Sequence, residues 1–335
     1  MGNVVNQKYK IGFQMNPIGE LNLKTDTTIR IVENYFKNGN DVFLFQPNDV
    51  FLEENQIFAF VRKVIFVKSN ANLEIFDIIL ADEIKIELKD MDIIWIRQDP
   101  PFDMNYITST FLLEKIENDV LILNNPSAIR NSPEKIMVTN FSDLMPKTLI
   151  TKNSNAIDDF CNKNGVCVIK PLYSKAGDSV FILDKNDKNY KSILEYFLNK
   201  YQEHVVVQKL IENVSLGDKR IMLLDGEILG VVNRVPKKNS VISNLAFGGV
   251  AEKCELSEKD IIICEKIKYK LKELGLFFVG IDVIDGMITE INVTSPTGIV
   301  SYFNLTKENK VIDIVDATYK KLEEFKNRKN YDNKN

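Results

Sequence analysis

Histidine and cysteine are scarce in this 335-residue sequence, which has one His and four Cys. The lone His204 excludes a metal site built from several histidines and argues against a catalytic triad with a histidine base. Cys161, Cys167, Cys254 and Cys264 include no Cys-x-x-Cys pair, so we expect reduced, partly buried thiols. Chemistry in this chain is therefore expected to depend on Asp, Glu, Asn, Lys and Arg.

The sequence also lacks an excess of positive charge and any long apolar run. With 43 Lys and Arg against 47 Asp and Glu, its net charge is −4, which argues against binding to nucleic-acid phosphates. No apolar stretch approaches the ~18 residues that cross a bilayer, and no basic segment followed by an apolar one opens the chain. We therefore expect a soluble cytoplasmic protein without nucleic-acid or membrane partners.

The first part of the chain predicts an α/β domain over residues 1–125. The expected elements are strands at 11–15, 41–45 and 93–96 and a helix at 26–38. Asp26 is expected to cap the helix, and the strand–helix–strand order favours a parallel sheet. The proline-rich segment 97–103 follows the last of these strands, at the edge where open α/β sheets bind ligands.

The rest of the chain predicts two α+β lobes, over 126–203 and 204–325, and a polar, disordered tail at 326–335. Two Asp-Gly pairs, at 225–226 and 285–286, predict tight hairpin turns. The other expected elements are strands at 145–150, 166–170, 179–183 and 204–211 and helices at 154–164, 190–200 and 257–274.

Three oxygen-bearing side chains interrupt otherwise apolar strands near the end of the second lobe. Glu290 and Asn292 are two residues apart and share one face of their strand, and Asp282 lies in the preceding strand. Carboxylate and amide oxygens suit Mg²⁺ that is shared with substrate phosphates. The alternative is that all three side chains face solvent on a half-exposed hairpin.

The turn between these two strands decides which side chains share a face. A two-residue Asp285-Gly286 loop is expected to place Asp282 and Glu290 on opposite faces. A three-residue loop ending in a left-handed Gly286 pairs Asp282 with Ile288 and brings the polar side chains together. We therefore predict the three-residue loop.

Lys170 closes an apolar strand and is placed to meet a phosphate as a point charge. The polar segment 173–179 behind it could cover phosphates with backbone N–H groups, or form a plain β-turn. Ser132 as N-cap and Pro133 predict the start of a helix that carries another lysine, Lys135.

Three further segments have both a functional and a structural interpretation. Segment 217–220 brings a cation to the start of a strand, where it could stabilise developing negative charge or end a hairpin in solvent. Segment 208–211 could present main-chain groups to an adenine or be an ordinary strand. Segment 236–250 could be a mobile lid, with Gly248-Gly249 as its hinge, or a surface loop.

In their order along the chain these motifs resemble the bacterial glutathione synthetase family of the ATP-grasp superfamily. The resemblance runs from about residue 9 to 325, and its most specific parts are Asp-Pro-Pro-Phe-Asp at 99–103 and Glu-Ile-Asn-Val-Thr-Ser-Pro-Thr at 290–297. It implies mixed α/β and α+β structure, with a Rossmann-like domain before a two-lobed ATP-grasp fold. It also implies ligation of γ-glutamylcysteine and glycine through an acyl phosphate, by a homo-oligomer that uses ATP with two Mg²⁺ ions or, alternatively, Mn²⁺.

The resemblance implies roles for individual residues as well. ATP would be bound by Lys135, Lys170, Ser174, Lys175, Gly177, Gln208, Lys209, Leu210, Ile211 and Asp218, and the metal ions by Asp282, Glu290 and Asn292. The peptide substrate would lie near Arg97, Asp99, Arg234, Ser295 and Thr297, and Arg220 would stabilise the charge on the reacting carboxyl group.

The chain departs from the family pattern on the substrate side. Ser174 and Ala176 replace glycines of the phosphate loop, the lid has no arginine, and Val300 stands where relatives have an arginine. Two alternatives therefore stay open: another ATP-dependent carboxylate–amine ligase with a different peptide or amine, and a non-catalytic ATP-binding module. Retention of all three metal-binding residues favours an enzyme.

Overall fold

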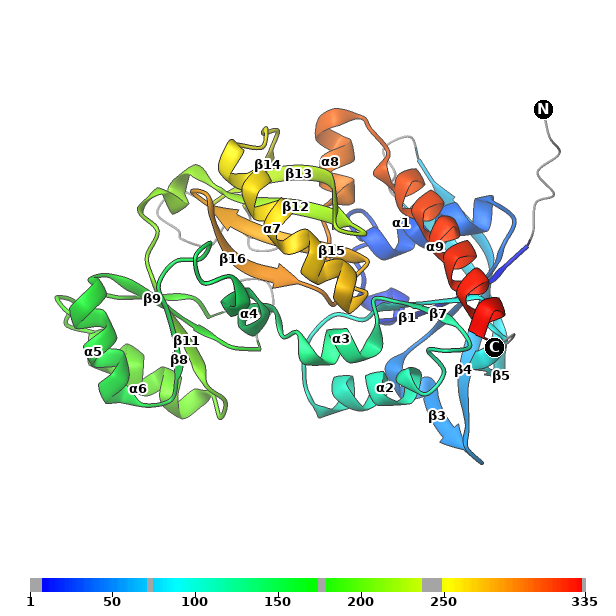
Figure 1. Cartoon of the computed structure of the whole chain (residues 1–335), viewed down its shortest axis with the longest axis horizontal. Coiled ribbons are helices and arrows are strands. Elements are labelled where there is room, and N and C mark those ends of the chain that lie inside the picture. The colour runs from blue at the N-terminus through cyan, green and yellow to red at the C-terminus, as the bar shows by residue number, and fades with distance from the viewer. Residues whose placement is uncertain (1–7, 71–74, 174–178, 237–248, 333–335) are drawn as a thin grey trace.

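The computed structural model describes residues 8–70, 75–173, 179–236 and 249–332. These residues form three sheets of seven, four and five strands. In Figure 1 the five-stranded sheet lies between the other two. Within the described ranges, no helix is both long enough and apolar enough to cross a bilayer. Short 3-10 helices lie at Ile18–Glu20, Pro47–Asp49, Leu88–Asp90, Val138–Phe141 and Glu212–Leu216.

The seven-stranded sheet belongs to the N-terminal domain, and its strand order is β3-β4-β2-β1-β6-β7, with β5 paired to β4. The predicted parallel arrangement is confirmed for β2, β1, β6 and β7, whereas β3, β4 and β5 add antiparallel pairs and make the sheet mixed. Asp26 caps α1 as predicted by accepting a hydrogen bond from the Ile29 N–H. The elements are β1 (Lys10–Met15), α1 (Thr27–Lys37), β2 (Asp41–Phe45), β3 (Val50–Glu53), β4 (Gln56–Ser69), β5 (Ile75–Glu87), β6 (Ile93–Arg97), α2 (Met104–Glu114) and β7 (Leu121–Leu123).

A small lobe follows after the two short helices α3 (Pro126–Asn131) and α4 (Glu134–Met137). Its antiparallel sheet has the order β10-β9-β11-β8, and side chains of both its helices pack with the sheet in one apolar cluster. The elements are β8 (Thr148–Thr151), α5 (Ser154–Asn164), β9 (Cys167–Pro171), β10 (Phe181–Leu183), α6 (Tyr190–Lys200) and β11 (Val205–Lys209). The predicted Ser132 cap is wrong: Pro133 is the N-cap of α4, since its ψ of 132° is not helical.

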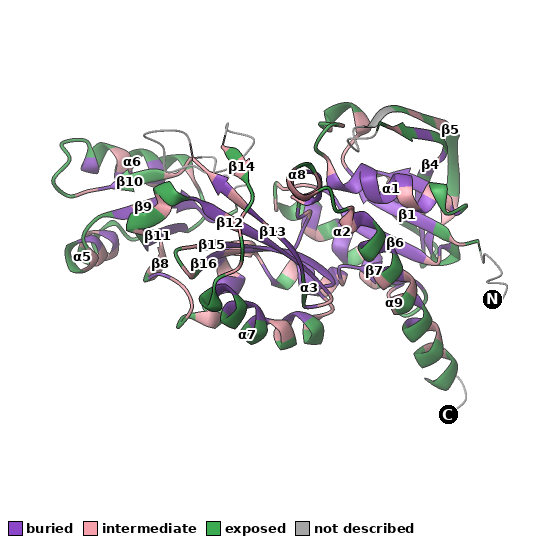
Figure 2. Ribbon diagram, turned by 90° about the horizontal axis from the view of Figure 1, so that it is seen from above, coloured by how far each residue is buried: buried purple, intermediate pink, exposed green. Residues whose placement is uncertain are grey.

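The large lobe is a five-stranded sheet of order β14-β13-β12-β15-β16, and α7 covers one face of it (Figures 1 and 2). Its strands are mostly buried, whereas the outer side of α7 is exposed (Figure 2). The elements are β12 (Asp218–Leu224), β13 (Glu227–Val235), β14 (Val250–Glu252), α7 (Glu258–Leu274), β15 (Phe278–Ile284), β16 (Met287–Asn292), α8 (Ile299–Thr306) and α9 (Lys310–Asp332).

The final helix corrects the expected disordered tail, because α9 continues to Asp332. It returns to the N-terminal domain and packs beside α1 (Figure 1), where the Tyr319 ring meets those of Tyr9 and Tyr35. Lys326 ion-pairs with Asp92 at 2.8 Å. Polar composition alone predicted disorder, but these tertiary contacts hold the segment in a helix.

Candidate active site

The candidate site is the face of the five-stranded sheet that is turned away from α7. Side chains alternate between the two faces of a strand. Ile281 and Ile291 belong to the apolar cluster that includes the buried side of α7, so their neighbours Asp282 and Glu290 lie on the other face. The strands β12, β13, β15 and β16 thus bring charged side chains together on one surface.

The register between β15 and β16 corrects the predicted loop. Ile284 pairs with Met287, so the Asp285-Gly286 turn has two residues, both with positive φ. A bulge in β16 nevertheless shifts the register between Val283 and Asp282, and Asp282 lies directly opposite Glu290. The bulge, rather than a longer loop, places the carboxylates on one face, and the prediction failed because it allowed irregularity only in the turn.

Arg220 and Asp282 form the centre of a buried charge network. They are paired across β12 and β15, and the guanidinium donates to both carboxylate oxygens, at 2.5 and 3.0 Å. Arg234 on β13 bridges Asp282 at 2.9 Å and Asp218 at 2.5 Å. Burial would raise the pKa of the Asp282 carboxyl, but the two guanidinium groups outweigh burial and hold this pKa well below its usual range.

A second cluster joins segments that are far apart in the sequence. The Glu290 carboxylate forms ion pairs with the ammonium groups of Lys170 of β9, at 3.4 Å, and Lys135 of α4, at 3.6 Å. Both lysine side chains are buried. Burial lowers the pKa of Lys170, with Glu290 opposing it. The two ammonium charges overcome the effect of burial on Glu290 and lower its pKa. Two buried ammonium groups, from α4 and β9, thus meet the Glu290 carboxylate of the sheet face.

The oxygen ligands on this face fit a divalent cation that is shared with a substrate. The Asn292 amide group donates to the Gly280 carbonyl and to Asp282 Oδ2, at 3.2 and 3.3 Å, which fixes its orientation. In the described part of the chain, no three His, Cys, Asp or Glu side chains form a metal cluster by themselves. Two carboxylates and an amide suit Mg²⁺, which takes few protein ligands and completes its shell with water and phosphate oxygens.

Sequence reasoning missed Glu134, which precedes Lys135 in α4. The Thr294 hydroxyl donates to its carboxylate at 3.1 Å, and burial raises the pKa of Glu134 to about 7. This side chain lines a small cavity between the N-terminal domain and both lobes, together with Phe102 and Tyr173, whose rings stack at 6.0 Å. For Glu134 itself the sequence carries no functional signal, only the helix start predicted around Pro133.

The residues expected to lie near the peptide substrate differ in burial and in the contacts that hold them. Arg97 is buried, and its guanidinium donates to the Pro296 carbonyl at 2.9 Å and the Thr28 hydroxyl at 3.1 Å, so it holds the 295–297 loop in place. Burial lowers its pKa to about 10. Asp99 is tied by its N–H to the Asn16 side chain at 2.8 Å. Thr297 is exposed and Ser295 half-buried, and Arg220 reaches the Thr297 carbonyl at 3.4 Å.

The expected nucleotide residues of the small lobe lie at the end of β11. Gln208 is buried and donates to the Thr148 hydroxyl at 2.8 Å. The N–H groups of Lys209 and Leu210 donate to backbone carbonyls of residues 147 and 166. Ile211 follows as the N-cap of a short 3-10 helix. Ser174, Lys175 and Gly177 and most of the expected lid, 237–248, lie outside the described residues.

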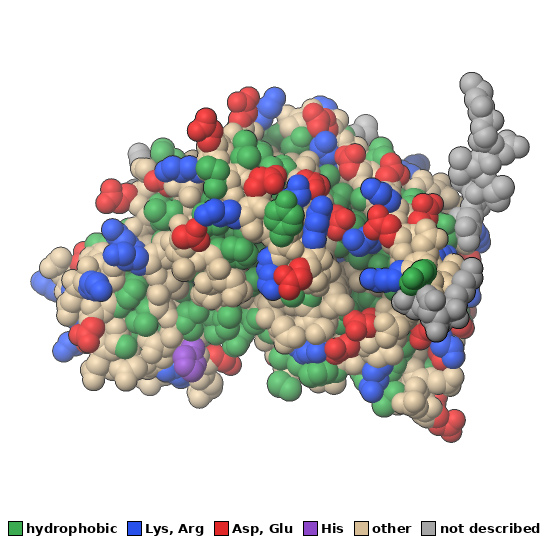
Figure 3. All heavy atoms as spheres, viewed as in Figure 1, with side chains coloured by type: hydrophobic (Ala, Val, Ile, Leu, Met, Phe, Trp, Pro, Cys, Tyr) green, Lys and Arg blue, Asp and Glu red, His purple; other side chains and the backbone are tan. Residues whose placement is uncertain are grey.

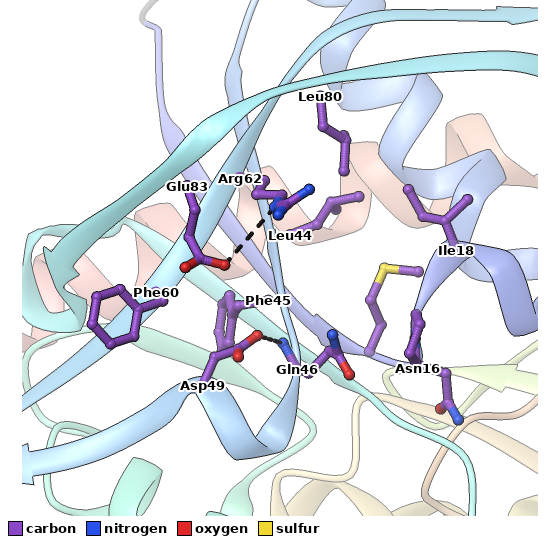
Figure 4. A pocket seen from close by; sticks show the side chains of 12 residues that line it. Asn16, Ile18, Leu44, Phe45, Gln46, Asp49, Phe60, Arg62, Leu80 and Glu83 are labelled. Atoms are coloured by element: carbon purple, nitrogen blue, oxygen red, sulfur yellow. Dashed lines mark hydrogen bonds and ion pairs between the residues drawn. The ribbon is translucent and has the colours of Figure 1, made fainter.

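A separate pocket opens in the N-terminal domain at the carboxyl ends of β1 and β2 (Figure 4). Its volume is about 340 Å³. Arg62 and Glu83 line it, and the Arg62 Nε lies 3.8 Å from a carboxylate oxygen of Glu83. Asn16 lines this pocket and also binds the Asp99 N–H, so the pocket adjoins the proline-rich loop. This edge of the sheet is the one where the sequence predicted a ligand.

Solved structures with the same architecture identify the fold. A D-cycloserine synthetase shares the fold with a TM-score of 0.65 at 12% identity, covering 93% of this chain and 99% of that one. A D-alanine–D-alanine ligase from Bacillus anthracis gives 0.59 at 14% identity, with 95% and 99% coverage. An ATP-grasp ligase, solved in complex with a precursor peptide, gives 0.60 at 15% identity, with 95% and 99% coverage. The chain has the ATP-grasp fold, as predicted.

Sequence comparison identifies the family. The family model for the prokaryotic glutathione synthetase N-terminal domain matches residues 9–130, and that for its ATP-grasp domain matches 134–307. Glutathione synthetases of Agrobacterium fabrum and Rhodopseudomonas palustris are 43% and 39% identical over 294 and 311 residues, which is 86% and 92% of this chain and 89% and 98% of theirs. The chain belongs to the prokaryotic glutathione synthetase family, and the predicted class of ATP-dependent carboxylate–amine ligase is confirmed.

Proposed function

We propose that this chain joins the cysteinyl carboxyl group of γ-glutamylcysteine to the amine of glycine, with ATP converted to ADP and phosphate. The observation that carries the proposal is the meeting of Lys135, Lys170 and Glu290, from three distant segments, beside the Arg220–Asp282 pair. Phosphoryl transfer to a carboxylate needs cations that bind phosphates and a cation that steadies the reacting carboxyl group, and this face offers both.

ATP is assigned to the space between the small and large lobes. Lys135 and Lys170 bind its phosphates, assisted by the Ser174, Lys175 and Gly177 loop. The adenine lies against the end of β11, at Gln208, Lys209, Leu210 and Ile211. Asp218 lies near the ribose, and its ion pair with Arg234 fixes the carboxylate for that role.

Mg²⁺ is the metal proposed for this site, held by Asp282, Glu290 and Asn292 as two ions with ATP; Mn²⁺ is the alternative. The ions would neutralise phosphate charge and align donor and acceptor. The stabilisation of the reacting carboxyl group is assigned to residues of the chain. Arg220, held by Asp282, stabilises negative charge on the carboxyl group that takes the phosphoryl group. The amine of glycine then attacks the acyl phosphate, and phosphate leaves.

The peptide substrate is assigned to the cleft edge bordered by Asp99, Arg234, Ser295 and Thr297. Arg97 contributes by holding the Pro296 carbonyl, which sets the position of the loop between Ser295 and Thr297. The adjoining pocket supplies Arg62 and Glu83, which match the α-carboxylate and α-amine of a γ-glutamyl group in charge.

The activity is tested by ADP release from Mg-ATP with γ-glutamylcysteine and with glycine, alanine, serine or no amine. We expect release that requires the dipeptide and strongly favours glycine. Turnover with another amine would reassign the acceptor, and ATP binding without turnover in any mixture, including other carboxylate donors, would favour a non-catalytic module.

We also propose a cytoplasmic location, a homo-oligomer and three domains, with one change to the predicted bounds (1–125, 126–203 and 204–325): β11 (Val205–Lys209) lies in the sheet of the small lobe, so the boundary between the lobes follows Lys209. Support for the oligomer comes from the β4–β5 hairpin, where β5 is an edge strand and Phe60, Ile65, Phe66, Ile79 and Ile84 are 37–56% exposed. Exposed apolar side chains on an edge hairpin are typical of an interface. On the face of the molecule drawn in Figure 3, positive and negative side chains are intermingled and form no cationic patch. Sedimentation of the chain and of an Ile65→Asp variant tests this, since the variant should shift to monomer.

A further inference from the structure

A stacked pair of aromatic rings joins the small lobe to the N-terminal domain. Phe102 belongs to the proline-rich segment 97–103, and Tyr173 follows the end of β9 by two residues. Their ring centroids lie 6.0 Å apart, with 24° between the ring planes. The Phe102 ring also meets that of Tyr106 in α2, at 5.1 Å, which holds it to the N-terminal domain. The pair therefore bridges a segment expected to lie near the peptide and a strand of the ATP-binding lobe.

A small cavity beside the two rings is lined by segments from both halves of the candidate site. Its volume is about 20 Å³, which is room for about one water molecule. Glu134 and Leu172 line it, and they lie close in sequence to Lys135 and Lys170, which are assigned to the ATP phosphates. Thr294 also lines it, next to the loop assigned to the peptide substrate, and its hydroxyl donates to Glu134 at 3.1 Å. Segments assigned to ATP and to the peptide thus share one close-packed junction.

The small lobe has an apolar core of its own. The buried cluster that fills it is built from side chains between Ile157 and Val207. A unit with its own core can shift relative to its neighbours, so the contacts at its border set its position. Lys170 lies at that border, because it stands near the end of β9 and reaches Glu290 of the large lobe at 3.4 Å. The ring of Tyr173, only a few residues further along the chain, therefore influences where Lys170 stands.

We propose that Phe102 and Tyr173 are positioning residues that couple the binding of the dipeptide to the binding of ATP, an inference that rests on the proposed function. The dipeptide binds beside Asp99 and fixes the segment that carries Phe102. Through the ring pair this segment holds the end of β9, so that Lys170 stands where the phosphates of ATP bind. Because such coupling is reciprocal, ATP tightens the binding of the dipeptide by the same factor.

The coupling is measured by titration calorimetry on the full-length protein with Mg²⁺, γ-glutamylcysteine and a non-hydrolysable ATP analogue. We expect the Kd of the analogue to be lower when the dipeptide is saturating. Tyr173→Ala should reduce the ratio of the two Kd values by about two- to tenfold, as for the loss of one aromatic pair. Tyr173→Phe keeps the ring and should keep the native ratio. Phe102→Leu should reduce the ratio as Tyr173→Ala does, and the double variant should reduce it no further, because the two rings act as one unit.

Tyr196→Ala is the matched control, because Tyr196 is an exposed tyrosine of the same lobe whose ring packs on Phe181 and Phe197. It should keep the native ratio. A merely structural role of the two rings would weaken the binding of the analogue equally with and without dipeptide, and the unchanged ratio would overturn the proposal. An equal loss of the ratio in Tyr196→Ala would overturn it as well.

The same titrations separate this proposal from the proposed function. If the dipeptide binds the native protein but leaves the Kd of the ATP analogue unchanged, the coupling is wrong and the proposed function stands. If the dipeptide does not bind the native protein at all, with or without the analogue, both are wrong.

Discussion

Arg220 and Asp282 stand directly opposite each other on β12 and β15, and the guanidinium of Arg220 engages both oxygens of the carboxylate. Asp282 in turn lies opposite Glu290 on β16. The sheet register therefore places the cation that we propose to stabilise charge beside the two carboxylates proposed to bind the metal. Bidentate pairing fixes the guanidinium plane as well as its distance, which a single-point contact would not do.

Arg220→Lys keeps the charge but loses the bidentate geometry. We expect kcat/KM to fall by about 10²–10³, as for removal of one stabilising donor, with the KM for ATP little changed. Arg130→Lys is the matched control, because half-buried Arg130 of α3 pairs with Glu114 of α2, outside the candidate site. Equal losses in the two variants would remove Arg220 from its assigned role.

Glu290→Gln removes a metal ligand and the carboxylate shared by Lys135 and Lys170. We expect the Mg²⁺ concentration for half-maximal activity to rise and kcat to fall by at least ~10², and Tm to fall as well, because the two buried lysines lose the negative charge that they share. Glu227→Gln is the control, since Glu227 also pairs with two lysines but on an exposed surface. An unchanged Mg²⁺ dependence in the Glu290 variant would contradict the metal assignment.

Glu134 predicts a pH dependence of stability. Its pKa is raised from 4.5 to about 7 in the folded protein, so between these values the folded state holds more protons and stability falls as pH rises. Glu134→Gln removes this slope. Urea unfolding at pH 5 and pH 7.5 should show a decline that is smaller in the variant by on the order of 1–2 kcal/mol. Parallel declines in both proteins would show that Glu134 is ionised throughout.

Asn124 joins the N-terminal domain to the hairpin that carries the metal ligands. Its side chain donates to the carbonyls of Phe278 and Val293 at 2.9 and 2.7 Å and accepts from the Phe278 N–H at 2.8 Å. Asn124→Ala leaves these buried groups without partners, and we expect a loss of about 2–4 kcal/mol in the free energy of unfolding. Asn38→Ala, at an exposed helix end, should cost less than ~0.5 kcal/mol.

Local signals explain which elements could be predicted from the sequence. Helices α5 and α6 were predicted to the residue, and α5 has clear boundaries at the Asn153 cap and at Gly165. Both Asp-Gly turns form where predicted and have two residues, although a three-residue loop was predicted for the second. The long β4–β5 hairpin was not predicted, because its exposed apolar side chains disturb the period-two pattern on which a strand assignment depends.

The candidate site was predicted less completely than the fold. The family motifs indicated Lys135, Lys170 and Glu290, which the structure brings together. The bulge that places Asp282 opposite Glu290 depends on tertiary packing and leaves no mark in the local sequence. Glu134 was missed for a similar reason, because its raised pKa comes chiefly from burial in the folded protein, which the local sequence does not show.

The central claim is that this site activates the carboxyl group of γ-glutamylcysteine as an acyl phosphate and transfers it to glycine. The most direct test uses dipeptide labelled with ¹⁸O in the cysteinyl carboxyl group, with Mg-ATP and glycine, and mass spectrometry of both products. Our account predicts glutathione and a phosphate that carries one ¹⁸O atom from the carboxyl group. Phosphate without the label, or release of phosphate without glutathione, would contradict it.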